Sequence, residues 1–139
     1  MMKHQLPVAI AALSVGLVIG SLETPGLDAQ PPAVTRTPLL QQDLEGIDGK
    51  EAVMFLAQIA PGAQSGRHYH PGTEIAYVLS GTGVVEVDGQ PPADLKEGAR
   101  AMMTPRTIHN AKNTGSTPLR ILVIMVHPKG EPGVVPVPQ

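Results

Sequence analysis

Residues 62–81 read Gly-Ala-Gln-Ser-Gly-Arg-His-Tyr-His-Pro-Gly-Thr-Glu-Ile-Ala-Tyr-Val-Leu-Ser-Gly, and this stretch decides the fold. It places three side chains of metal-ligating types, His68, His70 and Glu74, within seven residues. Side chains alternate between the two faces of an extended strand, so both histidines point the same way. The Pro-Gly pair at 71–72 breaks the strand and lets the chain turn. The pattern therefore predicts that two imidazoles and a carboxylate converge on one point.

A third imidazole is available downstream at His109, and Asn113 follows it four residues later. On a strand these two residues share a face, because their separation is even. The candidate ligand set is therefore His68, His70, Glu74 and His109. Asn113 has two interpretations: it orients a ligand from the second shell, or it serves the turn that follows it.

The spacing of these residues resembles the first of the two sequence motifs of the cupin family. That motif is Gly, five residues, His-x-His, three or four residues, Glu, six residues and Gly. This chain fills every fixed position of the motif, with Gly62, His68, His70, Glu74 and Gly81.

The second cupin motif is matched with one departure. It reads Gly, five residues, Pro-x-Gly, two residues, His, three residues and Asn, and this chain keeps the distances between Gly98, His109 and Asn113. Pro105 comes one place late, and Arg106 stands where the second glycine of the motif would be. The departure concerns the turn before the histidine and leaves the histidine itself in place.

The resemblance covers residues 53–126 and implies an all-β, single-domain, jelly-roll-like barrel with a divalent metal. The implied ligands are the four candidates above. Three imidazoles and a carboxylate form a set of intermediate hardness, which favours Fe(II) or Mn(II) and leaves Zn, Ni and Cu open. Cupins include dioxygenases, isomerases, decarboxylases, dehydratases, lyases and binding proteins without catalysis, so the fold leaves the reaction open.

Composition agrees with one all-β domain. The chain has 139 residues, 15 of them glycine and 15 proline, which favours many short turns over long helices. A net charge of −2 without a basic stripe, and only three aromatic residues, argue against nucleic-acid binding. No cysteine is present, so the sequence contains neither a disulfide nor a thiolate metal ligand. A pocket would be walled by aliphatic side chains and methionine.

Alternation and turn signals predict short strands in a regular order. An N-terminal tether and edge strand occupy residues 30–49, the barrel domain residues 50–127, and a proline-rich irregular tail residues 128–139. Residues 119–126 form a nearly unbroken apolar run, which predicts a strand buried on both faces. The predicted strands cover residues 35–41, 51–60, 74–79, 84–87, 99–104, 108–112 and 119–126.

Residues 1–29 have the pattern of a secretory signal peptide. Lys3 and His4 precede an apolar run over residues 6–19, which is shorter than the ~20 residues needed to span a bilayer. Cleavage after Gly20 or after Ala29 is compatible with this pattern. We expect export to the periplasm or the extracellular space, with no membrane association after removal of the signal.

The expected function is an exported metal-dependent enzyme of the dioxygenase or oxidoreductase type that acts on a small organic substrate. Glu74 is a candidate base as well as a ligand. The alternatives are a binding protein without catalysis and a lyase or isomerase that uses the metal as a Lewis acid. A homodimer through sheet edges is a further expectation.

Other polar residues receive simpler interpretations. Alternation turns Tyr69 and Tyr77 away from the metal, and a histidine at the end of the last strand, His127, is interpreted as structural. Isolated charges at strand ends are ordinarily solvated, although three of them could bind an acidic substrate: Arg100, Arg106 and Lys112. The neighbouring Met102 and Met103 are interpreted as core or pocket lining.

Overall fold

The computed structural model describes residues 32–138, and this part of the chain consists of strands, turns and loops. The predicted signal segment lies outside the described residues. Within them, no helix is long and apolar enough to cross a membrane. The strands are β1 (Val34–Asp43), β2 (Lys50–Ile59), β3 (His68–Tyr69), β4 (Thr73–Ser80), β5 (Thr82–Val87), β6 (Ala93–Lys96), β7 (Arg100–Met103), β8 (His109–Asn113), β9 (Leu119–Pro128) and β10 (Val135–Pro136).

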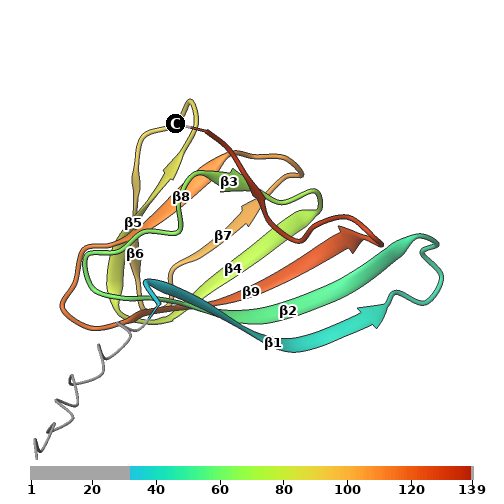
Figure 1. Ribbon diagram of the computed structural model, residues 1–139, viewed down its shortest axis with the longest axis horizontal. Coiled ribbons are helices and arrows are strands. Elements are labelled where there is room, and N and C mark those ends of the chain that lie inside the picture. Colours follow the sequence, from blue (N-terminus) through green and yellow to red (C-terminus); the bar gives the residue numbers. More distant parts are fainter. Residues whose placement is uncertain (1–31, 139) are drawn as a thin grey trace, which may run out of the picture. The chain divides into compact units, whose positions relative to one another are not determined.

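The strands form two five-stranded antiparallel sheets that face each other as the walls of a barrel (Figure 1). The first, called here the long sheet, has the order β1-β2-β9-β4-β7. The second, called here the short sheet, has the order β10-β3-β8-β5-β6. The all-β, jelly-roll-like prediction is confirmed.

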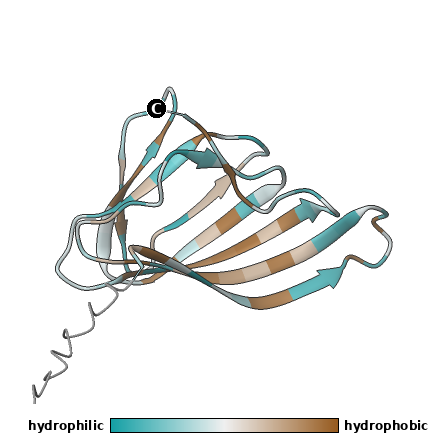
Figure 2. Cartoon of the chain, in the orientation of Figure 1, coloured by the Kyte–Doolittle hydropathy of each residue, from teal (hydrophilic) through white to brown (hydrophobic). Residues whose placement is uncertain are grey.

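The core lies between the two sheets and is aliphatic. Alternation gives each strand one inward row, so β9 buries every second residue along its length. Figure 2 shows hydrophobic residues running along β2, β4 and β9, whereas β3 is hydrophilic. The buried apolar residues that pack together are Phe55, Ile59, Val78, Ala111, Leu119, Ile121, Val123 and Met125.

Strand β9 differs from the prediction that both of its faces are buried. Its outward residues are partly accessible, and Val126 is 40% exposed. The physical reason is that, within the described residues, no helix or further sheet covers the outer face of the long sheet, so only one face faces a core.

The proline-rich tail is irregular over most of its length, but two of its residues form a strand. Val135 and Pro136 form β10, which pairs with Tyr69 and His68 of β3. The bond from the Val137 amide to the Arg67 carbonyl, 2.9 Å long, extends this contact. Proline is tolerated here because β10 is the edge of the short sheet, where a missing donor faces away from the neighbouring strand. The tail therefore completes the sheet that carries the histidines.

Candidate metal centre

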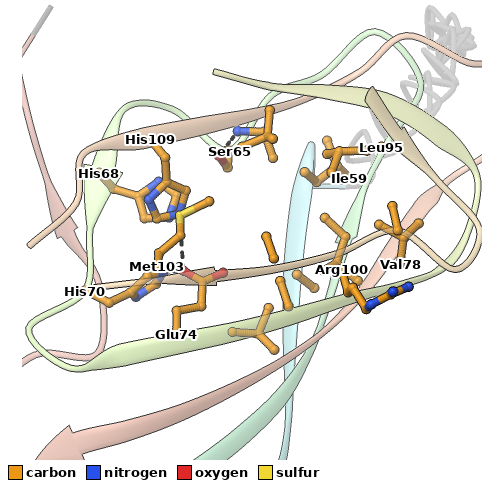
Figure 3. A pocket seen from close by; sticks show the side chains of 18 of the residues that line it. Ile59, Ser65, His68, His70, Glu74, Val78, Leu95, Arg100, Met103 and His109 are labelled. Carbon is orange, nitrogen blue, oxygen red and sulfur yellow. Dashed lines mark hydrogen bonds and ion pairs between the residues drawn. The ribbon is translucent and has the colours of Figure 1, made fainter. Parts of the chain in front are cut away.

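The four candidate ligands come from both sheets and meet inside the barrel (Figure 3). His68 on β3 and His109 on β8 are direct cross-strand partners in the short sheet, and His70 follows β3 immediately. Glu74 reaches in from β4 of the long sheet, in register with inward-facing methionines on both neighbouring strands. The centre is therefore assembled by the packing of the two sheets.

The side chains are buried and close together. Each is between 4 and 6% exposed. One ring nitrogen from each of the three histidines lies within 4.8 Å of the others, a group that could hold a metal ion. Oε2 of Glu74 lies 3.1 Å from Nε2 of His70 and 3.3 Å from Nε2 of His109. The structure thus brings together all the ligands predicted from the sequence.

Backbone carbonyls fix which nitrogen of each imidazole faces the centre. Nδ1 of His68 bonds to the Gly66 carbonyl at 2.8 Å, and Nδ1 of His109 bonds to the Thr107 carbonyl at 2.9 Å. A carbonyl oxygen can only accept, so Nδ1 carries the hydrogen. In the neutral ring Nε2 then presents a lone pair. A hydrogen-bonded second nitrogen is the usual arrangement of a metal-bound histidine.

His70 is oriented by a distant part of the chain. Its Nδ1 donates to the carbonyl of Gly133 at 2.6 Å, in the loop between β9 and β10. This carbonyl is 63 residues away in sequence. The tail therefore supports the centre both by pairing with β3 and by holding one of its imidazoles.

The carboxylate of Glu74 faces these lone pairs without a hydrogen donor of its own. Its Oε2 is buried and has no hydrogen-bond partner when the neighbouring imidazoles are neutral with hydrogen on Nδ1. An anion and two lone pairs at 3.1 to 3.3 Å repel one another unless a cation lies between them. The residues present therefore fit a divalent metal. In the metal-free protein, a proton on Nε2 of His70 would supply the positive charge that the Glu74 carboxylate lacks.

The pKa values follow this arrangement. Burial is the main reason why the pKa of His68 falls from 6.5 to about 4, with the charges of His109, His70 and Arg36 acting in the same direction. Burial alone would lower the pKa of His70, but the hydrogen bond and charge of Glu74 raise it above its ordinary value. Burial would raise the pKa of Glu74, yet His70 holds it below its usual range.

Two turns position the ligands. Gly72 passes so close to β9 that a Cβ would lie 2.1 Å from the carbonyl oxygen of Val126, so only glycine fits between His70 and Glu74. Arg106, at the position of the missing motif glycine, has a φ of 65°. It is the only non-glycine residue with positive φ among residues 32–138. This conformation costs about 1 kcal/mol or more.

Contacts offset that strain. The amide of Arg106 donates to the carbonyl of His70 at 2.8 Å, and its guanidinium lies 5.6 Å from the centre of the Tyr69 ring. The turn over residues 104–107 therefore forms with Arg106 in the left-handed conformation. It also carries the Thr107 carbonyl to His109.

A partly open cavity of about 120 Å³ adjoins the centre. Alanine, valine and isoleucine form most of its wall, and Met103 reaches toward the histidines (Figure 3). Arg100 lies at the opposite end of the cavity from the histidines, beside Val78. An engineered cavity of 150 Å³ binds benzene, so this cavity suits a ligand of that size or smaller.

Asn113 is buried, but its hydrogen bonds correspond to the turn interpretation. Its Nδ2 donates to the carbonyls of Ile59 and Thr117, each at 2.8 Å, and its Oδ1 accepts from the amide of Gly115 at 2.8 Å. These bonds join the end of β2 to the turn before β9. The supports of the ligands are instead the three backbone carbonyls described above.

The remaining polar residues lie apart from the centre. Tyr77 is 44% exposed, as alternation predicts, and Lys112 is paired with Glu86 at 2.7 Å. His127 is buried and donates from Nε2 to the carbonyl of Glu131 at 2.9 Å, which agrees with a structural role. Met102, expected in the core or pocket, is 71% exposed because it belongs to the outward row of β7.

Sequence reasoning missed Arg36 and the carbonyl acceptors. Two acceptors stand two residues before the histidine they serve, Gly66 before His68 and Thr107 before His109. This spacing of two residues is visible in the sequence and could have identified both acceptors. Arg36 lines the cavity from β1, and although it lies within the predicted edge strand, that stretch has no apolar alternation to indicate which face is turned inward.

Fold and site together define a single-domain β-barrel with a buried histidine cluster that could hold a metal ion. Residues 55–125 match the family described as the cupin domain. The chain belongs to the cupin family.

Solved structures agree on the fold. An uncharacterised protein with a double-stranded β-helix domain from Klebsiella pneumoniae is 20% identical with a TM-score of 0.63, over 78% of this chain and 89% of that one. A cupin superfamily protein from Desulfitobacterium hafniense is 22% identical with a TM-score of 0.58, over 73% of this chain and 84% of that one. The DMSP lyase DddQ from Ruegeria pomeroyi is 23% identical with a TM-score of 0.56, over 62% of this chain. This chain spans 43% of the DMSP lyase. Comparison with curated proteins gives no match.

Proposed function

We propose that the chain is a metal-dependent cupin enzyme of the oxidoreductase type, acting on a small and largely apolar organic substrate. One observation carries the proposal. Three imidazole Nε2 atoms and an unpartnered carboxylate oxygen converge at one end of a partly open, largely apolar cavity. Such an arrangement is unfavourable without a cation and leaves room beside it for a substrate.

The residues that would hold the metal are His68, His70, Glu74 and His109. The mixture of imidazole and carboxylate favours Fe(II) or Mn(II), with Zn, Ni and Cu as alternatives. A bound ion would supply redox or Lewis-acid chemistry, and any coordination position that the protein leaves open would be available to substrate and to dioxygen or water.

The protein's own groups have separate roles in this proposal. The carbonyls of Gly66, Thr107 and Gly133 keep the hydrogen of each imidazole on Nδ1. Glu74 supplies the negative charge, and its carboxylate could accept a proton only if it leaves the metal during turnover. The aliphatic walls exclude water from the reacting end of the cavity.

The cavity lining favours oxidoreductase chemistry over proton-transfer chemistry. A lyase or isomerase needs positioned acids and bases to move protons. Among the described residues that line the cavity, the carboxylates are Glu74 and Asp94, and no tyrosine, lysine or cysteine is present. With Glu74 occupied as a ligand, chemistry carried by the metal fits the lining better.

Metal analysis of the purified protein, followed by oxygen uptake with a panel of catechols and diketones, tests the proposal. We expect about one metal per chain and substrate-dependent oxygen uptake. Turnover that continues without oxygen would replace the oxidoreductase by the Lewis-acid lyase or isomerase. Stoichiometric metal and ligand binding without any turnover would identify a binding protein.

We also propose export directed by residues 1–29 and a homodimer through an exposed sheet edge. The long sheet ends at β1, which carries the exposed side chains of Leu39 and Leu40. The mature protein is then expected outside the cytoplasm without the signal segment. Mass spectrometry showing an intact Met1 on the native protein would contradict export, and a monomeric mass by light scattering would contradict the dimer.

A further inference from the structure

Arg36 is the one cationic side chain of the described residues that lines both the cavity and the more open groove beside it. It lies on β1 opposite Ala57 of β2, and the side chain of Ala57 also lines the cavity. The register therefore places Arg36 in the inward row of the long sheet. The groove, of about 550 Å³, runs past Arg36 and Phe55, which are the residues shared by the two hollows.

Arg36 stands where the cavity and the groove meet, and its side chain is exposed. Arg100, the other arginine of the cavity lining, lies beside Val78 at the end opposite the histidines (Figure 3) and does not line the groove. Arg36 is therefore the arginine at the boundary between the groove and the cavity.

Arg36 has no carboxylate partner within the described residues. The ion pairs of lysine and arginine in this part of the chain are Arg67 with Asp88, Lys112 with Glu86, and Lys129 with Asp43. A cation at the entrance of an apolar cavity, without a protein anion to neutralise it, attracts an anionic ligand. A divalent ion held by one carboxylate would add to the positive potential there.

We infer that the cavity takes a small carboxylate with a short apolar body, and that Arg36 binds the carboxylate group where the cavity meets the groove. This inference rests on the proposed function, since it concerns the same cavity. An arginine guanidinium forms two parallel hydrogen bonds to a carboxylate, which gives orientation as well as affinity. The aliphatic walls then take the body of the ligand. The cavity volume of about 120 Å³ limits that body to a few carbon atoms.

The experiment compares butanoate with butanamide, two probes of nearly the same shape that differ in charge. Each is titrated into zinc-loaded protein, because zinc has no redox chemistry and keeps the measurement to binding. The metal content of every sample is measured first. We expect butanoate to bind at least about 10-fold more tightly than butanamide, the range of a hydrogen bond to a charged group.

Substitutions assign the effect to one residue. Arg36→Gln should weaken butanoate binding about 10- to 100-fold, leave butanamide binding unchanged and leave the zinc content unchanged. Arg100→Gln and the outward-facing Arg120→Gln are the matched controls and should retain the preference. Equal binding of both probes to the wild type would overturn the inference. A preference that survives in Arg36→Gln would overturn the role of this arginine.

The outcomes separate this inference from the proposed function. Protein that takes up no zinc contradicts the proposed metal centre, and this is known before any probe is added. Zinc-loaded protein without a carboxylate preference contradicts only the inference. Butanoate binding through Arg36, together with no turnover of any substrate tried, would support the inference and contradict the enzyme.

Discussion

Glu74→Gln should separate the metal-binding role of the carboxylate from its place in the fold. Glutamine keeps the shape of the side chain but removes the charge that faces a bound cation. Removing one partner of a buried ion pair costs about 3–5 kcal/mol, because the other charge is left uncompensated. At about 1.4 kcal/mol per tenfold change, metal affinity should fall about 10²- to 4 × 10³-fold.

In the metal-free protein, the same substitution should slightly increase the stability of the fold. An amide N–H at the position of Oε2 would lie about 3 Å from the lone pairs of His70 and His109 and could donate to one of them, which contributes about 1 kcal/mol. At low pH the wild-type protein has a stabilising interaction of its own, between protonated His70 and the Glu74 carboxylate, which the substitution removes. The raised pKa of His70 gives stability that is present below its unfolded value of 6.5 and is lost as the pH rises through the folded value. The gain should therefore be largest near pH 8.

Isothermal titration with Mn(II) and Zn(II) measures the loss of affinity, and thermal unfolding of metal-free protein at pH 6 and pH 8 measures the change in stability. Glu86→Gln is the matched control, since this exposed carboxylate pairs with Lys112 outside the cavity. The control should bind metal as the wild type does. Metal affinity in Glu74→Gln within about threefold of the wild type would refute the role of the carboxylate.

Three further predictions test the ligands and their supports. His68→Ala and His70→Ala should each lose most bound metal. Both variants should remain folded, because the aliphatic core lies apart from the centre. Unchanged metal content in both would contradict the site. Deleting residues 129–139 removes β10 and the carbonyl that holds His70, so metal affinity should fall about 10- to 100-fold by calorimetry, and an unchanged value would deny the tail its role. In nitrogen-15 NMR of metal-free protein, His68 should stay neutral with hydrogen on Nδ1 until the pH approaches about 4, and protonation near 6.5 would contradict its burial.

Much of the barrel and all of the candidate ligands could be predicted from the sequence. Alternation assigns His68 and His70 to one face and Tyr77 to the other without knowledge of the partner strands. The motif spacing then adds Glu74 and His109, which local patterns alone leave unconnected. The structure brings these four side chains together, and their role as metal ligands stays a prediction.

The parts that failed depend on long-range packing. The tail contains four prolines, so its composition indicates an irregular course, and only the unpaired edge of β3 explains why it becomes β10. The Gly133 carbonyl has no local signal, because its partner His70 is distant in sequence. The apolar run of β9 indicates two covered faces, whereas its outer face lies on the exposed side of the long sheet.

The measurement that tests the central claim most directly is the anomalous diffraction of crystals of Mn(II)-loaded protein. The account predicts one strong anomalous peak per chain, in contact with Nε2 of His68, His70 and His109 and with Oε2 of Glu74. A peak bound elsewhere, or full metal loading with none of these four atoms in contact with the ion, would contradict it.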